Sequence, residues 1–290
     1  MAIERKTKRL EHAGIAALLA GLAACSPMNE GEGEGEVAVN AGDEGGGYSA
    51  AAGEGEGEGE GEGSAASGGG EFGIDPAQAA RNPVTYLTAL EVMRAHYLAG
   101  IAAYEVDRRA VAAEMFTHPI SEIYVDLEEV LLQLGAPEFG DLLSAAAAAP
   151  YDGSSDAEIR AAVAAVLIAI DEAETHAPAS DHSNASIEAQ LLVNMVMRAA
   201  LQYEYAASTD IHNGPYLDGY GFTASARVIS DRYLDDIRAL DGEVADRLSA
   251  AMDALIAAYP TVLAPDILDA DAEAIIQLAQ AASTEVERLE

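Results

Sequence analysis

Beyond residue 76, apolar positions recur at intervals of three or four residues. After Asn82-Pro83 they form one stripe: Tyr86, Leu90, Met93, Tyr97, Gly100 and Tyr104. Such spacing places side chains on one face of an α-helix. Asn is a favoured helix N-cap and Pro fits the first helical turn, so we expect a long amphipathic helix that begins at Pro83.

The rest of the chain repeats this pattern, and it lacks alternating β-branched runs joined by Asn-Gly or Asp-Gly turns. Further helices are expected at about 107–116, 119–134, 139–148, 155–175, 186–207, 223–240, 243–258 and 266–289. Long amphipathic helices on short connections favour antiparallel packing. Residues 76–290 are therefore predicted to form an all-α antiparallel helical bundle, with four main helices and several accessory ones.

The N-terminus has the pattern of an export signal. A basic stretch at 5–9 precedes an apolar run at 13–24, which is too short to span a bilayer and typical of a signal-peptide core. The run ends in Leu22-Ala23-Ala24-Cys25, which resembles a bacterial lipobox. The alternative is a secretory signal with an incidental Cys. Because Cys25 is the only Cys of the chain, we predict cleavage after residue 24 and lipidation of Cys25.

Lipidation of Cys25 implies an address in the bacterial cell envelope. The acyl chains would be the contact with the membrane, on its periplasmic face. Ser26 follows the Cys, and by resemblance to enteric sorting rules this favours the outer membrane over the inner one.

Residues 25–75 have the composition of a linker. Glycine and glutamate alternate at 31–36 and 53–63. Such a segment buries too little apolar area to offset its backbone entropy. We expect a disordered acidic tether between the lipidated Cys25 and the bundle.

The charge and the motif content exclude several functions. The chain carries 50 Asp and Glu against 15 Lys and Arg, a formal net charge of −35. Such a surface repels phosphate, so no nucleic-acid partner is expected. One Cys excludes an internal disulfide and a multi-Cys metal site. No nucleophile elbow, H-E-x-x-H, P-loop or dinucleotide fingerprint occurs, and the chain is predicted not to be an enzyme.

The best candidate site contains His118 and Glu122. Four residues apart on a helix, an imidazole and a carboxylate can share one metal ion. The alternative is that Pro119 begins a helix, that His118 is its N-cap and that Glu122 stabilises its positive end. His96 lies at the edge of the apolar stripe of the first helix and would face His118 if the two segments pack together. Its alternative role is that of a hydrogen-bonded core histidine.

A second candidate is the Tyr-rich segment 202–222. It is predicted to run from a helix end into a Gly-punctuated loop that carries Asp210, His212 and Asp218. Hard oxygen donors beside a histidine suit ferric iron or another hard cation. His212 and Asp218 are thus further candidate donors, and an aromatic-pinned helix connection is the alternative. The methionines also suggest copper, but Met at helical spacing typically fills the core, so iron is preferred to copper or zinc.

These residues carry a resemblance to proteins of bacterial iron uptake. The residues concerned are His96, Tyr104, His118, Pro119, Glu122, Tyr124, Tyr203, Glu204, Tyr216, Asp218, Tyr220, Gly221 and Phe222. Their pattern over about residues 84–235 resembles imelysin-like proteins and the periplasmic extensions of ferric-iron permeases. The imelysin G-x-H-x-x-E motif is absent around His96, and the permease R-E-x-x-E motif is absent as well.

The resemblance implies a helical domain that binds or hands over a metal outside the cytoplasm. The predicted function is therefore that of a lipid-anchored metal-binding protein in metal uptake or handover, with an envelope transporter as a candidate partner. The alternative is a cell-envelope scaffold or interaction protein that binds no metal.

Overall fold

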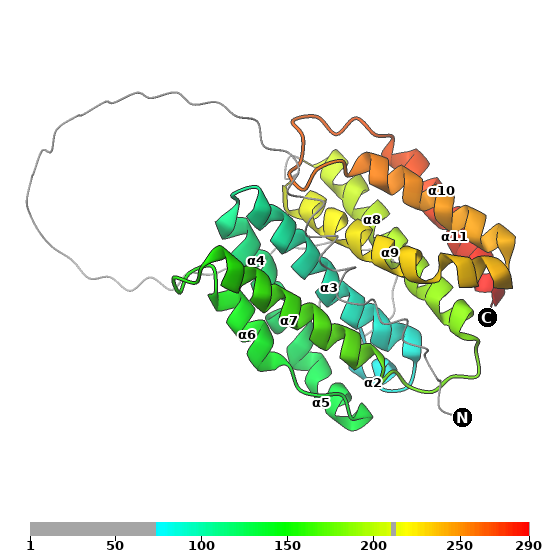
Figure 1. The fold of residues 1–290 in the computed structure, drawn as a ribbon. Coiled ribbons are helices and arrows are strands. Elements are labelled where there is room, and N and C mark those ends of the chain that lie inside the picture. Colours follow the sequence, from blue (N-terminus) through cyan, green and yellow to red (C-terminus); the bar gives the residue numbers. More distant parts are fainter. Residues whose placement is uncertain (1–73, 210–212, 290) are drawn as a thin grey trace, which may run out of the picture.

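The computed structural model describes residues 74–209 and 213–289, which are helical and contain no strand (Figure 1). The helices are α2 (Pro76–Ala79), α3 (Pro83–Glu105), α4 (Arg109–Pro119), the π-helical turn η2 (Ile120–Tyr124), α5 (Val125–Leu134), α6 (Gly140–Ala148), α7 (Asp156–Glu174), α8 (Asn184–Ser208), α9 (Asn213–Leu240), α10 (Gly242–Ala258), α11 (Ala272–Val286) and the 3-10 turn η3 (Glu287–Leu289). The predicted all-α fold is confirmed. The predicted signal peptide, Cys25 and residues 25–73 of the predicted linker lie outside the described residues.

Helix α3 is the centre of the bundle. It begins as predicted, because the Asn82 side chain accepts hydrogen bonds from the backbone N–H groups of Val84 and Thr85. The single apolar stripe predicted one buried face, but every residue from Tyr86 to Tyr104 is buried. Helices α4, α7, α8 and α9 all pack on α3, which explains why this helix has no solvent-exposed face over these residues.

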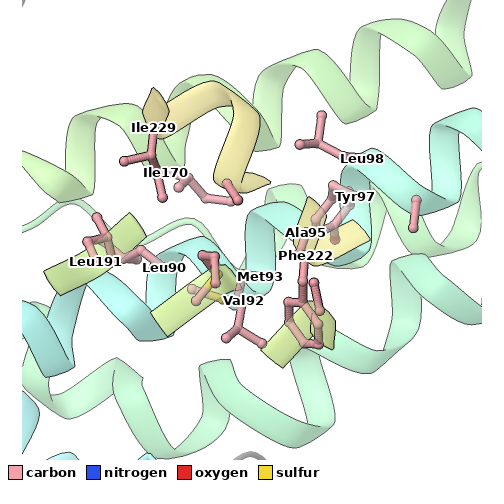
Figure 2. Close-up of a cluster of buried hydrophobic side chains, with 14 of the residues drawn as sticks. Leu90, Val92, Met93, Ala95, Tyr97, Leu98, Ile170, Leu191, Phe222 and Ile229 are labelled. Atoms are coloured by element: carbon pink, nitrogen blue, oxygen red, sulfur yellow. The ribbon is translucent and has the colours of Figure 1, made fainter. Parts of the chain in front are cut away.

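The core joins α3 to the other long helices. Figure 2 shows Leu90 and Met93 of α3 in one cluster with Ile170 of α7, Leu191 of α8 and Ile229 of α9. Helices α8 and α9 lie side by side, and α10 and α11 cover them on the side away from α7 (Figure 1). Helices α3, α7, α8 and α9 are the four longest described ones, and α3 contacts each of the other three. None of the described helices is long and apolar enough to cross a membrane.

The predicted loop before residue 223 was wrong, because the described part of α9 already starts at Asn213. Its glycines are sites of close packing. A Cβ atom on Gly221 would lie 2.6 Å from the backbone oxygen of Ala95, and one on Gly219 would overlap the hydroxyl of Tyr259. Glycine thus allows α9 to approach α3 and Tyr259 while remaining helical.

The predicted helix start at Pro119 was also wrong. Pro119 is the last residue of α4, and the chain continues through η2 into α5 without a break. Pro119 lacks the N–H that would donate one turn back, and a π-helical turn follows it in which Val125 donates to the backbone oxygen of Ile120. His118 is therefore a helical residue and not an N-cap.

The last long helix also begins later than predicted. Residues 266–270 are not helical, and α11 starts at Ala272. Its N-cap is Asp271, whose side chain accepts a hydrogen bond from the backbone N–H of Ala274. The predicted start at about residue 266 was therefore six residues too early, because the side chain that caps the helix is that of Asp271.

Candidate metal centre

Three of the predicted donors meet between α3 and the α4–η2 run. His96, His118 and Glu122 each offer one ligand atom, and these atoms all lie within 4.8 Å of one another. The Nε2 atom of His96 is 3.9 Å from Oε2 of Glu122, and Nδ1 of His118 is 3.7 Å from Oε1 of Glu122. The two imidazole centroids are 5.7 Å apart at an angle of 71°. No other group of three His, Cys, Asp or Glu ligands this close occurs in residues 74–209 and 213–289.

Close packing of α3 on α4 positions the two histidines. A Cβ on Gly100 would lie 2.5 Å from Cε1 of Phe116, so glycine lets the two helices approach there. The Tyr97 ring stacks on Phe116 at 5.5 Å, and its hydroxyl donates to the Phe116 backbone oxygen at 3.2 Å. His96 follows directly before Tyr97, and His118 lies two residues after Phe116. These contacts therefore fix the backbone on both sides of the centre.

His96 is held in the form that binds metals. Its Nδ1 lies 2.8 Å from the backbone oxygen of Val92, which can only accept, so Nδ1 carries the proton and Nε2 has the lone pair. Burial lowers the pKa of His96 to about 4, although the Val92 hydrogen bond raises it; the nearby His118 lowers it further. The imidazole is therefore neutral near pH 7, with Nε2 directed toward Glu122.

The other side of the centre opens to solvent. The side chain of His118 is 32% exposed and that of Glu122 17%, against 1% for His96. The Nε2 atom of His118 points to Glu114, whose Oε1 is 3.9 Å away. An ion at this centre would have protein on the His96 side and access to water on the His118 side.

Of the other two predicted donors, only Asp218 lies in the described part of the chain, and it is not in this group. His212 lies outside the described residues. Asp218 is a partly buried residue of α9, and its charge adds to the effect of burial in raising the pKa of Tyr259. Phe222, one turn further along α9, is the α9 residue whose ring packs against His96, with centroids 6.4 Å apart.

Two tyrosines of the second candidate site, Tyr203 and Tyr216, make packing and hydrogen-bond contacts within the fold. Tyr203 and Tyr216 pack on Tyr259, with ring centroids 5.4 and 4.9 Å away. The hydroxyl of Tyr216 donates to the backbone oxygen of Thr261, and that of Tyr203 accepts from the N–H of Ala270. These contacts tie the connection between α10 and α11 to α8 and α9. The alternative expected an aromatic-pinned connection within 202–222 itself, whereas the tyrosines hold a connection that is distant in the sequence.

A buried ionic network joins α3, α7 and α9, and it was not predicted from the sequence. Arg94 pairs with Glu91 at 3.0 Å, with Asp171 at 2.9 Å and with Glu174. Arg232 of α9 pairs with Asp171 at 2.9 Å and with Glu174 at 3.5 Å. The available signal in the sequence was an acid and a base three residues apart, Glu91 and Arg94, among the apolar residues of the predicted first helix.

Glu91 is the most perturbed carboxyl of this network. Burial raises its pKa to about 8; Arg94 opposes the shift, whereas Glu174 adds to it. The hydroxyl of Ser225 on α9 donates to Oε2 of Glu91 at 2.6 Å. The raised pKa favours the protonated form of Glu91, in which the two arginines are balanced by Asp171 and Glu174.

The donor set at the centre restricts the chemistry. Two imidazole nitrogens and one carboxylate suit zinc and non-haem iron(II), and three protein ligands leave coordination positions open. Val92 accepts the remaining proton of His96, and ligating histidines usually have such a partner. His96, His118 and Glu122 thus fit one transition-metal ion.

Comparisons with protein-family models, with curated proteins and with solved structures found no match for this chain. The resemblance to imelysin-like proteins therefore stays a prediction. The predicted lack of enzymatic activity, the envelope location and the partners stay predictions as well.

Proposed function

We propose that this chain is a lipid-anchored, non-catalytic metal-binding protein of the bacterial cell envelope, which takes up or hands over a transition-metal ion. His96, His118 and Glu122 are its ligands. The observation that carries the proposal is the placement of one ligand atom from each residue within 4.8 Å of the others, although His96 lies on a different helix.

Charge favours a divalent ion. Two neutral imidazoles and one carboxylate leave a divalent ion with one excess positive charge and a ferric ion with two. Excess charge is costly in a centre whose innermost ligand is buried. We therefore infer iron(II) as the form of iron, in place of the hard ferric ion that the Tyr-rich segment suggested. Zinc(II) satisfies the same donors and serves as a stable probe.

Exposure favours exchange over permanent storage. His118 is 32% exposed, so an ion can reach or leave the centre on that side. The net charge of −35 concentrates cations near the surface. A lipid anchor at Cys25 would keep the bundle near membrane partners, and an envelope transporter is the kind of partner proposed.

The test is a metal titration of the full chain, purified without chelator. Iron(II), under anaerobic conditions, and zinc(II) are titrated at physiological ionic strength, where exposed charges are screened beyond about 8 Å. We expect one ion per chain. His118→Ala and Glu122→Gln should each weaken binding by about 100-fold or more, because a direct ligand counts for more than the 10–100-fold typical of an outer-shell partner.

The chain contains a matched control pair. Glu172 and His176 are also four residues apart, Glu172 in α7 and His176 in the turn that follows it, with Nε2 4.0 Å from Oε1. The His176 side chain is 28% exposed, close to the 32% of His118, and within the described part of the chain the pair belongs to no group of three ligands. Glu172→Gln and His176→Ala should leave the affinity unchanged. If His118→Ala and Glu122→Gln also bind as the wild type does, the metal-binding proposal is wrong and the scaffold alternative is preferred.

A further inference from the structure

His118 lies between two carboxylates on one continuous helical run. Glu114 is four residues before it and Glu122 four residues after it. Oε1 of Glu122 is 3.7 Å from Nδ1 of the imidazole, and Oε1 of Glu114 is 3.9 Å from Nε2. The two nitrogens of one ring thus face two different carboxylates.

The two histidines of the centre differ in how they are held. The His96 ring is buried and its Nδ1–H is fixed by the backbone of Val92. His118 is partly exposed, and its Nε2 faces Glu114. When an ion binds at Nδ1, the proton of His118 must sit on Nε2, on the side of Glu114.

We propose that Glu114 is the positioning residue of His118. It accepts a hydrogen bond from Nε2–H and holds the ring so that Nδ1 points at the ion between Glu122 and His96. The role rests on the proposed function. At 3.9 Å the contact is longer than a hydrogen bond, and binding of the ion closes it to about 2.8 Å, the usual length of a charge-assisted bond.

Little has to move for this contact to close. The Glu114 side chain is 68% exposed, so a change of rotamer costs no packing. A carboxylate behind a ligating imidazole fixes its tautomer and orientation and makes its other nitrogen a better donor. Glu114 would thus provide for His118 what Val92 provides for His96.

A Glu–His pair at this spacing is not sufficient by itself. Glu172 and His176 have the same order and spacing, but Nδ1 of His176 lies 3.3 Å from the backbone oxygen of Leu134. The two pairs differ at the second ring nitrogen. That of His118 faces the carboxylate of Glu122, and the ring packs against the imidazole of His96, whereas that of His176 faces a backbone oxygen.

The experiment measures zinc(II) affinity of the full chain by competition with a chromophoric chelator. The variants are Glu114→Ala and Glu114→Gln, with Asp126→Asn as a control that removes an exposed acid one turn beyond Glu122. We expect Glu114→Ala to lose about 10–100-fold in affinity, as is typical of outer-shell partners. Glu114→Gln should lose less, because an amide oxygen still accepts from Nε2–H, and Asp126→Asn should change affinity by less than about twofold, as expected of a screened surface charge.

Two further readouts separate positioning from a general effect on folding. Cobalt(II) absorption should change in Glu114→Ala, because the ligand geometry changes, while the melting temperature of the metal-free protein stays the same. The ¹⁵N shifts of His118 in the zinc-bound wild type should place its proton on Nε2, which checks the premise that the ion is bound at Nδ1; a proton on Nδ1 would overturn the positioning role.

The outcomes distinguish the two proposals. If the wild-type chain binds no zinc, both are wrong. If the wild type binds zinc and Glu114→Ala binds it equally well, or Asp126→Asn loses as much as Glu114→Ala, only the positioning role is overturned.

Discussion

The buried carboxyl of Glu91 should make the stability of the bundle depend on pH. Its Oε2 accepts from Arg94 at 3.0 Å and from Ser225 at 2.6 Å, and it lies beside Glu174. Glu91→Gln keeps an oxygen for these two donors and an N–H to donate to Glu174, but it cannot ionise. The substitution therefore removes the titration and preserves the shape.

The sign follows from proton binding in the two states. The pKa of Glu91 rises from 4.5, its ordinary value in the unfolded chain, to about 8 in the folded protein. The folded state therefore holds the proton more tightly, and this contribution to stability is fully present below pH 4.5 and is lost as the pH rises through 8. Between pH 5 and pH 8 the loss integrates to about 3 kcal/mol.

The assay is urea unfolding of the wild type and Glu91→Gln at pH 5, 6, 7 and 8. The free energy of unfolding of the variant, relative to the wild type, should rise by about 3 kcal/mol over this range. Glu128→Gln, at an exposed position of α5, measures what the loss of one charge does to the same curves. Parallel curves for wild type and Glu91→Gln would refute the inference that Glu91 is protonated in the folded protein.

Two more predictions concern packing and location. Gly221→Ala should destabilise the fold by about 1–3 kcal/mol, as overpacking does, because its Cβ would lie 2.6 Å from the backbone oxygen of Ala95; Gly214→Ala on the same helix, with nothing within 4 Å, is the control, and equal thermal shifts would contradict the packing argument. Cys25→Ser should release the protein from membrane fractions, because acyl chains would be its apolar anchor; unchanged membrane retention would show that Cys25 is not the anchor.

Local signals allowed the helices to be predicted. The start of α3 follows from Asn82 and Pro83. The start of α7 follows from Ser155, which forms a capping box with Glu158. Each cap depends on residues no more than three positions apart, so the sequence contains all the necessary information.

Long-range packing could not be predicted in the same way. Gly219 and Gly221 suggested a loop, because the partners that make glycine necessary there, Tyr259 and Ala95, are distant in the sequence. No buried ionic network was predicted from Glu91 and Arg94, because their partners lie on two other helices. These partners are Asp171, Glu174 and Arg232. The structural role of a glycine or of an ion pair within a helix can be inferred only when the surface that packs against it is known.

The candidate centre combines both kinds of information. The spacing of His118 and Glu122 predicted a shared face, and this holds although a π-helical turn begins between them. A π turn widens the helix, but four residues still complete about one turn, so the side chains stay on the same side. The alternative of an N-cap failed because Pro119 is accommodated inside the run.

His96 could be placed only through the packing of α3 on α4, which Gly100 permits and which no local rule reveals. The same dependence explains why Asp218 lies outside the group: it was chosen as part of a loop, and once α9 is a helix it is Phe222 that contacts His96. His118 and Glu122, which were predicted from helical spacing, thus lie together with His96. Asp218 was predicted as a donor because it was expected in a loop, and that reason no longer holds because the residue is in a helix.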